Sequence, residues 1–222
     1  MTTAIILAGG KSERMGANVD KAFLSLVDKP MVAWSLLVFE RTAEIDRIVL
    51  VVRKDQLVAS QAVVKMFGIS KIEKIVAGGG KRQDSVAAGL AACDLDTRIV
   101  VIHDAARPLV TSDLVAEVVR QAKRVPAVTV GQPVVDTLKV CEKGSTVTKT
   151  VPRERLWAVQ TPQAFQVKEL RAAYKALGKE EITDDCAALE RIGVAVKIVT
   201  NHRPNFKVTV PDDLHLVGAL LK

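Results

Sequence analysis

Apolar residues along this chain form short continuous runs that alternate with longer segments in which apolar positions recur at helical spacing. The short runs, rich in Ile, Val and Leu, predict strands at Ile5–Ala8, Ile45–Arg53, Ile72–Ala77, Arg98–Ile102 and Ala127–Val130, of which Ile5–Ala8 and Arg98–Ile102 are expected to be buried. The segments between them predict helices over Pro30–Arg41, about Gln56–Phe67, about Asp84–Ala92 and Ser112–Lys123. This alternation is typical of a mostly parallel α/β sheet, in which binding sites lie at the carboxyl ends of the strands.

The pattern changes after Pro133, where polar and apolar residues begin to alternate. Thr137–Cys141 and Val147–Val151 predict two strands of a hairpin that turns around Gly144 and Ser145. A two-stranded hairpin is only marginally stable by itself. We therefore expect it to lie against a second subunit, or else to fold back on its own domain.

Beyond the hairpin, the α/β pattern resumes and continues to the end of the sequence. It predicts an extended segment at Trp157–Phe165, a helix at Lys168–Leu177, a helix at Thr183–Ile192 capped by Thr183, a strand at Ala195–Thr200 and a helix at Pro211–Leu221. We find no repeat, linker or low-complexity segment. The sequence thus predicts one domain over residues 1–222, with an arm at about 133–156.

Three loops that carry glycine or charge, at 9–21, 78–85 and 103–108, each follow a predicted strand and should therefore meet at one edge of the sheet. The first begins at Gly9-Gly10 and carries Lys11, Arg14 and Lys21. Glycine lets backbone N–H groups approach phosphate oxygens, because it has no Cβ. The spacing matches neither G-x-x-x-x-G-K-[ST] nor G-x-G-x-x-G. The loop itself favours a phosphate site, with a plain strand-to-helix turn as the alternative.

Composition limits the possible partners. Hydrophobic residues make up 49% of the chain and charged residues 26%, which is ordinary for a globular protein. We expect neither a targeting segment nor a membrane span, since no apolar run approaches roughly 18 residues. The net charge of +7 suits nucleic acid, anionic small molecules or simple solubility. Several basic residues flank loop glycines, and no aromatic–basic interleaving is present, so phosphate ligands are favoured over a nucleic-acid surface.

The cysteines indicate neither a disulfide framework nor a zinc site. Cys93, Cys141 and Cys186 are odd in number and lack C-x-x-C spacing. We therefore expect a reducing, cytoplasmic environment.

Several motifs, taken in order along nearly the whole chain, resemble the sugar-phosphate nucleotidyltransferases of the glycosyltransferase-A-like fold, and most closely their 2-C-methyl-D-erythritol 4-phosphate cytidylyltransferase family. The motifs are LAGGKSERMG with Lys21, GGGKRQDSV, HDAARP, DTLK, TVPRERLW, TPQ, ITDD and NFKVTVPDD. The resemblance implies a three-layer α/β/α Rossmann-like domain with a dimerisation arm.

One departure leaves the sugar open. Many members of the family have a proline and two alanines where this chain has Leu7, Ala8 and Gly9. The LAGG form also occurs in cytidylyltransferases of other polyol phosphates, such as ribitol 5-phosphate. Two further alternatives are a relative that guanylylates a pterin cofactor, which HDAARP and the arm disfavour, and a basic nucleic-acid-binding module, which lacks a recognition signature.

The implied reaction is attack of a sugar-phosphate oxygen on the α-phosphorus of CTP, with release of pyrophosphate. A phosphate monoester is largely a dianion at neutral pH, because its second pKa lies near about 6. No general base is then required, and His103, His202 and His215 have no suggestive local partner. The difficulty is repulsion between two anions, so we expect positive charge and positioning to carry catalysis.

The resemblance also implies roles for individual residues. Arg14 and Lys21 would stabilise the transition state, while Arg153 and Lys207 would position the sugar phosphate. The nucleotide would contact Ala8, Gly9, Gly10, Ser12, Gly79, Gly80, Arg82, Ser85, Asp104 and Ala105. The sugar phosphate would contact Asp104, Arg107, Thr137, Thr161 and Thr183.

Some of these roles have alternatives, and some depend on a partner or an ion. Asp84 and Ser85 could simply cap a helix, and Arg107 could be structural or reach a neighbouring subunit. The family's active sites are shared in a homodimer, with Arg153 and Thr137 supplied by the arm of the other subunit. Mg²⁺ or another divalent cation would be held mainly by the triphosphate, with Asp104 as a protein ligand.

Overall fold

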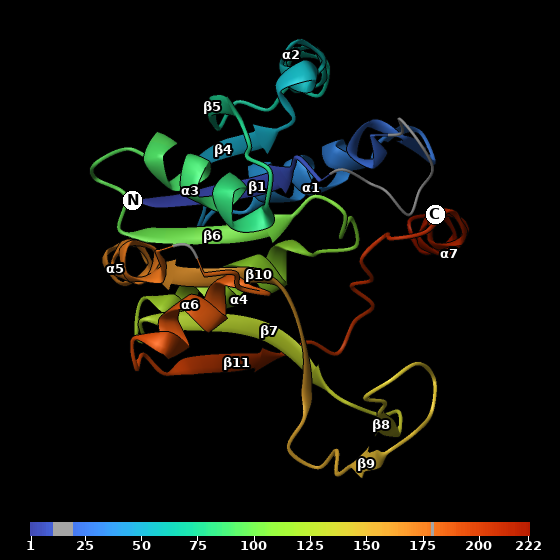
Figure 1. The fold of residues 1–222 in the computed structure, drawn as a ribbon. Coiled ribbons are helices and arrows are strands. Elements are labelled where there is room, and N and C mark those ends of the chain that lie inside the picture. Colours follow the sequence, from blue (N-terminus) through green and yellow to red (C-terminus); the bar gives the residue numbers. More distant parts are fainter. Residues whose placement is uncertain (11–19, 179) are drawn as a thin grey trace.

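The computed structural model describes residues 1–10, 20–178 and 180–222. Its centre is a seven-stranded sheet in the order β11-β7-β10-β6-β1-β4-β5 (Figure 1). These strands are β1 (Thr2–Ala8), β4 (Arg47–Val52), β5 (Ile72–Ala77), β6 (Ile99–Asp104), β7 (Ala127–Pro133), β10 (Trp157–Gln166) and β11 (Val196–Thr200). All pairs are parallel except those of β10, which runs antiparallel to both β6 and β7. The predicted mostly parallel α/β sheet is confirmed.

Helices cover both faces of the sheet and create three layers. They are α1 (Met31–Arg41), α2 (Leu57–Met66), α3 (Arg82–Ala92), α4 (Ser112–Ala122), α5 (Val167–Leu177) and α6 (Asp185–Arg191), while α7 (Pro211–Leu220) lies at the carboxyl edge. Alternation along β1 shows how the two cores form: Ile6 packs into the cluster that includes α1, α2 and α4, whereas Ile5 packs into the cluster that includes α3, α5 and α6. Both isoleucines are fully buried, so the sheet is apolar on each face.

A third, smaller cluster lies at the carboxyl edge of the sheet. There α7 packs through Val217 against Leu26 and Met31, together with Ala106 and Val208. Leu26 belongs to the short pair β2 (Ser25–Leu26) and β3 (Lys29–Pro30), and the described residues also include the 3₁₀ turns η2 (Lys21–Phe23) and η3 (Lys54–Gln56). Through this cluster, the C-terminal helix α7 packs near the carboxyl ends of the sheet strands.

The arm stands away from the main sheet (Figure 1). Its strands β8 (Leu138–Val140) and β9 (Lys149–Val151) pair antiparallel with each other in a separate two-stranded sheet. The predicted hairpin is therefore confirmed, and it does not fold back on the main sheet. None of the helices in the described part of the chain is both long and apolar enough to cross a membrane.

The predicted extended segment Trp157–Phe165 is confirmed, and it forms the antiparallel strand β10 inside the sheet. Two local expectations need correction. Helix α6 is capped by Asp184, which accepts from the Ala187 N–H at 3.1 Å, and not by the exposed Thr183. Helix α3 begins at Arg82, and Asp84 takes part in capping it by accepting from the Lys81 N–H at 3.0 Å, whereas the buried Ser85 lies inside the first turn and is not a cap.

Candidate active site

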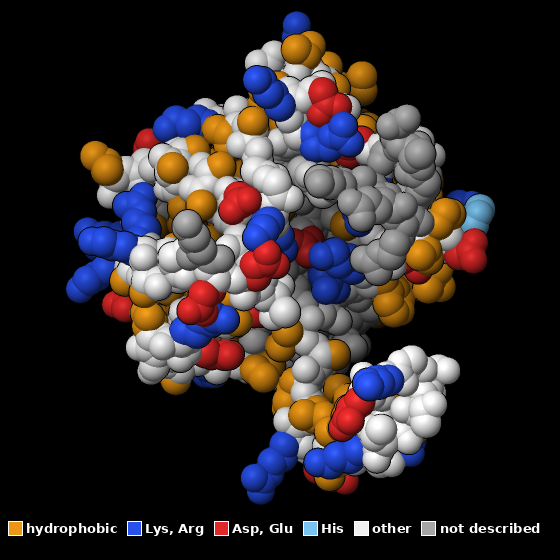
Figure 2. All heavy atoms as spheres, in the orientation of Figure 1, with side chains coloured by type: hydrophobic (Ala, Val, Ile, Leu, Met, Phe, Trp, Pro, Cys, Tyr) orange, Lys and Arg blue, Asp and Glu red, His pale blue; other side chains and the backbone are white. Residues whose placement is uncertain are grey.

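A cavity of about 510 Å³ opens at the carboxyl edge of the sheet. The end of β1, the loop after β5 and the end of β6 all reach it, as predicted, and the segment before α7 closes one side. Figure 2 views this face, where basic and acidic side chains lie close together around a hollow. The described lining residues are Leu7, Ala8, Gly9, Gly10, Asp20, Lys21, Ala22, Met31, Gly79, Gly80, Lys81, Arg82, Ser85, Asp104, Ala105, Ala106, Lys207 and Thr209.

Asp104, the last residue of β6, has a basic partner on each carboxylate oxygen. Oδ1 lies 3.3 Å from Arg82 Nε, and Oδ2 accepts from Lys207 Nζ at 2.6 Å. Burial alone would raise the pKa of Asp104, but Arg82 and Lys207 outweigh burial and hold that pKa below its usual range. The cavity therefore contains an ionised carboxylate between two cations, which come from α3 and from the segment before α7.

Lys21 adds a third described cation to the lining. It begins η2, where Asp20 Oδ1 caps the turn by accepting from the Ala22 N–H at 3.1 Å. The Lys21 ammonium donates to the Val208 carbonyl oxygen at 3.1 Å, one residue beyond Lys207. Lys21 and Lys207 thus approach the cavity from opposite ends of the sequence. Arg14 and Ser12, the other two predicted residues of this loop, lie outside the described residues.

The loop after β5 depends on glycine because it passes close to the first turn of α3. A Cβ on Gly78 would stand 2.5 Å from Ser85 Oγ, and one on Gly79 would stand 2.3 Å from Asp84 Cβ. Ser85 Oγ accepts from the Gly79 N–H at 3.2 Å and donates to the Lys81 carbonyl oxygen at 3.3 Å. Ser85 therefore holds the loop against the helix as well as lining the cavity.

This close approach predicts that Gly79→Ala is destabilising. The new methyl group would meet a Cβ that cannot move without the helix, so we expect a loss of about 1–3 kcal/mol in the free energy of unfolding, as for other overpacked sites. Gly80→Ala is the matched control, since a Cβ there would meet only Asp84 Oδ2, at 4.0 Å. Urea unfolding of both variants measures the difference, and equal stabilities would contradict this account of the loop.

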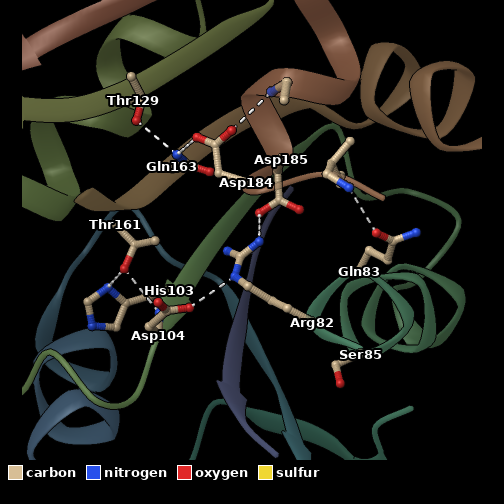
Figure 3. A network of polar contacts seen from close by, with 12 residues as sticks. Arg82, Gln83, Ser85, His103, Asp104, Thr129, Thr161, Gln163, Asp184 and Asp185 are labelled. Carbon is tan, nitrogen blue, oxygen red and sulfur yellow. Dashed lines mark hydrogen bonds and ion pairs between the residues drawn. The ribbon is translucent and has the colours of Figure 1, made fainter. Parts of the chain in front are cut away.

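A buried hydrogen-bond chain fixes the backbone of Asp104 (Figure 3). Thr161 Oγ accepts from the Asp104 N–H at 3.1 Å and lies 3.1 Å from His103 Nδ1. Burial lowers the pKa of His103 to about 3, so its imidazole is neutral. The Arg107 carbonyl oxygen can only accept, so Nε2–H of His103 donates to it at 3.2 Å, and Nδ1 then accepts from the Thr161 hydroxyl.

The buried histidine makes stability depend on pH. The unfolded chain gains a proton at His103 below its ordinary pKa of about 6.5, while the folded protein stays neutral there. The free energy of unfolding should therefore fall as the pH drops below 6.5, with a His103 contribution approaching about 1.4 kcal/mol per pH unit. His103→Gln should flatten this slope, whereas His215→Gln, at an exposed position, should leave it unchanged. Urea unfolding between pH 7 and pH 4.5 makes the test, and identical slopes in the wild type and His103→Gln would exclude this contribution.

The segment that carries Lys207 is fastened to the site from both sides. The buried Asn205 donates from Nδ2 to the Thr161 carbonyl oxygen at 2.8 Å, and its own carbonyl oxygen accepts from Arg107 Nη1 at 2.8 Å. The Val208 N–H donates to the Ala106 carbonyl oxygen at 2.8 Å. Arg107 thus has a structural contact within its own chain, which fits the structural alternative considered for it.

Most of the predicted nucleotide residues lie together at the cavity. Those that line it are Ala8, Gly9, Gly10, Gly79, Gly80, Arg82, Ser85, Asp104 and Ala105. Of the residues predicted to contact the sugar phosphate, Asp104 lines the cavity and Thr161 lies buried behind it. Thr183 is exposed before α6, and Thr137 and Arg153 are exposed on the arm. None of these three lines the described cavity of the same chain.

Several lining residues were not singled out from the sequence. Asp20, Lys81 and Thr209 lie inside or beside the quoted motifs, so their motif position was the available signal. Met31 begins α1 and gave no chemical signal, because a methionine at helical spacing also suits the core.

The described side chains fit a magnesium ion only if substrate phosphate oxygens supply most of its ligands. No group of three or more His, Cys, Asp or Glu residues that could hold a metal is found in residues 1–10, 20–178 and 180–222. Asp104, held ionised at the cavity wall, supplies the type of oxygen ligand that Mg²⁺ prefers. Mg²⁺ commonly binds through one or two carboxylates together with substrate phosphates, and Asp104 suits that arrangement.

Comparisons with known proteins agree over almost the whole chain. The "2-C-methyl-D-erythritol 4-phosphate cytidylyltransferase" of Alkaliphilus oremlandii is 39% identical over 224 residues, which cover 100% of this chain and 95% of the relative. The Dehalococcoides mccartyi protein of the same name is 41% identical over 220 residues, covering 99% and 95%.

Solved structures give the same result. The 4-diphosphocytidyl-2C-methyl-D-erythritol synthase of Anaerococcus prevotii superposes with a TM-score of 0.87 at 29% identity, covering 99% of this chain and 95% of that one. The 2-C-methyl-D-erythritol 4-phosphate cytidylyltransferase of Thermus thermophilus gives 0.78 at 30% identity, covering 98% and 97%. The nucleotidyltransferase fold is therefore shown. A sequence profile for 2-C-methyl-D-erythritol 4-phosphate cytidylyltransferase matches residues 2–222, so the chain belongs to that family.

Proposed function

We propose that the protein performs the reaction for which its family is named: it transfers the cytidylyl group of CTP to 2-C-methyl-D-erythritol 4-phosphate, in the non-mevalonate route to isoprenoid precursors. A phosphate oxygen of the sugar attacks the α-phosphorus of CTP, the bond from that phosphorus to the bridging oxygen of the β-phosphate breaks, and pyrophosphate leaves. The observation that carries the proposal is the cavity at the strand ends, where Lys21, Arg82 and Lys207 gather around glycine backbone and Asp104.

The nucleotide occupies the side of the cavity formed by β1 and the loop after β5. Gly9, Gly10, Gly79 and Gly80 leave backbone accessible to phosphate, ribose and base, because no Cβ shields it. Ser85 lies at the same wall. In support, small residues (Ala8, Gly9, Gly10, Gly79 and Gly80) line the wall against which the triphosphate and pyrimidine are proposed to bind.

Catalysis rests on positive charge that is already in place before the reaction. Lys21, together with Arg14, stabilises the charge that develops at the α-phosphate, and the phosphate dianion of the sugar needs no general base. Lys207 positions the sugar phosphate. In support, the Lys207 ammonium contacts Asp104, the Lys21 ammonium contacts the Val208 carbonyl oxygen, and the buried neutral His103 is occupied in a structural chain.

Magnesium is the proposed cofactor, held mainly by triphosphate oxygens with Asp104 as its protein ligand. Bound there, it would neutralise charge on the triphosphate and so ease the approach of a second anion. The partner of Asp104 that must adjust is Lys207, whose ammonium is 2.6 Å from Oδ2. The sugar phosphate offers that ammonium a new anionic partner.

The proposed location is the cytoplasm. The working form is proposed to be a homodimer in which Arg153 and Thr137 reach the active site of the other subunit. The support is an arm whose apolar side chains are exposed, and whose Thr137 and Arg153 do not line the described cavity of their own chain. Val135 is 78% exposed and Val147 52%, and Val159 at the base of the arm is 44% exposed. Such side chains are stabilised when a second subunit covers them.

A panel of sugar phosphates tests the function. With CTP and Mg²⁺, pyrophosphate release should be fastest with 2-C-methyl-D-erythritol 4-phosphate and at least about tenfold slower with ribitol 5-phosphate, since fit of the sugar sets specificity. ATP, GTP and UTP in place of CTP test the base. Faster pyrophosphate release with ribitol 5-phosphate would replace the proposed substrate by the alternative. A rate of pyrophosphate release that none of the sugar phosphates increases would reject the function.

A further inference from the structure

The mechanism above leaves one fully buried carboxylate without a role. Asp185, the first residue of α6, is 0% exposed. Its Oδ1 accepts from the Tyr174 hydroxyl at 2.5 Å, and its Oδ2 lies 2.8 Å from Arg82 Nη1. Figure 3 shows the Arg82 guanidinium between Asp185 and Asp104. Leaving a buried charge of this kind unpaired costs free energy, so separating Asp185 from Arg82 is unfavourable.

The Asp185 contact sets the direction of the Arg82 side chain. The contact to Asp185 is 2.8 Å long, whereas the contact from Nε to Asp104 is 3.3 Å. Asp185 is also the more shielded partner, because its side chain is 0% exposed and that of Asp104 is 10% exposed. A guanidinium is a rigid, planar fork, so the ion pair of Nη1 with Asp185 and the hydrogen bond from Nε to Asp104 together fix its orientation.

The neighbouring residue repeats the attachment. Gln83 donates from Nε2 to the Glu180 carbonyl oxygen at 2.8 Å, and its Oε1 accepts from the Ile182 N–H at 3.1 Å. Two successive residues of the first turn of α3 are therefore held, one by the first residue of α6 and the other by the segment that leads into α6. That turn directly follows Gly79 and Gly80 at the cavity wall.

We propose that Asp185 is a positioning residue for nucleotide binding: by holding Arg82, it fixes the first turn of α3 and the glycine loop before it, and it aims Arg82 Nε at Asp104. Asp185 does not touch either substrate. The inference rests on the proposed use of CTP. A purely structural Asp185 would instead stabilise the packing of α5 and α6 and leave the affinity for CTP unchanged in folded protein.

Asp185→Asn tests this role, because it keeps the shape of the side chain and removes the charge opposite Arg82. We expect the dissociation constant of CTP with Mg²⁺, measured by isothermal titration calorimetry, to rise about tenfold, while KM for the sugar phosphate changes less than about twofold. Asp184→Asn is the matched control. Asp184 caps α6 and accepts from Gln163 at 2.8 Å without an ion pair to Arg82, and asparagine caps equally well.

Two further variants keep the test informative if Asp185→Asn does not fold. Tyr174→Phe removes only the hydroxyl that donates to Asp185 and should weaken CTP binding by about two- to threefold. Arg82→Lys keeps the charge but not the fork, and in that background Asp185→Asn should have a much smaller effect than in the wild type.

The outcomes separate this inference from the function itself. Folded Asp185→Asn or Tyr174→Phe protein with wild-type affinity for CTP would overturn the positioning role, as would full additivity with Arg82→Lys. Equal weakening of CTP and sugar-phosphate binding would also overturn it. Wild-type protein that binds CTP but releases no pyrophosphate with any sugar phosphate would reject the proposed function alone, and wild-type protein that does not bind CTP would overturn both.

Discussion

Lys21→Ala is expected to lower the turnover number by a factor of about 10²–10³, the usual effect of removing one preorganised electrostatic contact from a transition state. Lys21 lines the cavity and its ammonium is anchored 3.1 Å from the Val208 carbonyl oxygen, beside the segment that carries Lys207. That anchor is made to backbone, so the charge is in place before the substrates arrive. The loss should appear in the turnover number more than in KM, because charge develops at the α-phosphate only during the reaction.

Lys54→Ala is the control for Lys21→Ala, since it makes the same change in net charge at an exposed position outside the cavity. Pyrophosphate release under saturating CTP and sugar phosphate measures both variants. Turnover of Lys21→Ala within a few-fold of the wild type would remove Lys21 from the catalytic machinery.

Arg153→Ala is expected to have the second large effect, about 10²-fold in turnover over KM with the sugar phosphate, although Arg153 lies on the arm and outside the described cavity of its own chain. The physical reason is that a guanidinium binds a phosphate dianion through two parallel hydrogen bonds, which both attract and orient it. If the arm of one subunit completes the site of the other, this loss occurs in the partner's site.

Mixed dimers of the proposed homodimer test where Arg153 acts. Arg153→Ala and Lys21→Ala subunits, each tagged differently and purified as heterodimers, should regain a substantial fraction of activity, because one of the two sites then has both residues. Heterodimers that are as inactive as either homodimer would contradict a shared site. A wild-type rate in the Arg153→Ala homodimer would contradict any role of the arm in substrate positioning.

The sheet and the location of the cavity were accessible from the sequence for a simple reason. The continuous apolar run Ile99–Ile102 is buried on both faces within β6, and the predicted strand Ile72–Ala77 has the bounds of β5 at the edge of the sheet. Once strands and helices alternate, the carboxyl ends of the parallel strands must share an edge. Glycine and charge directly after three of those strands then indicate a site, without any knowledge of contacts between them.

What the sequence could not predict depends on contacts between distant segments. β10 is antiparallel because the chain returns from the arm between β6 and β7, and no local pattern specifies that insertion. Thr161, expected at the substrate, lies opposite Asp104 in this strand and its hydroxyl holds the Asp104 backbone. Whether it also contacts substrate stays a prediction.

Asp185 illustrates the same limit at the level of side chains. Its motif, ITDD, was recognised, yet nothing local distinguishes Asp184, which caps a helix, from Asp185, which pairs with Arg82. The two neighbours point to different partners only because α6 packs beside α3 and β10. The role of each carboxylate follows from tertiary structure alone.

One labelling experiment tests the central claim most directly. The reaction is run with CTP, Mg²⁺ and 2-C-methyl-D-erythritol 4-phosphate that carries ¹⁸O at all non-bridging phosphate oxygens. The masses of the products are measured by mass spectrometry. Direct attack by the sugar phosphate on the α-phosphorus predicts a cytidine diphosphate ester that retains every labelled oxygen, together with an equal amount of unlabelled pyrophosphate. Formation of CDP and a sugar bisphosphate, loss of label from the ester, or hydrolysis of CTP to CMP without an ester would contradict the account.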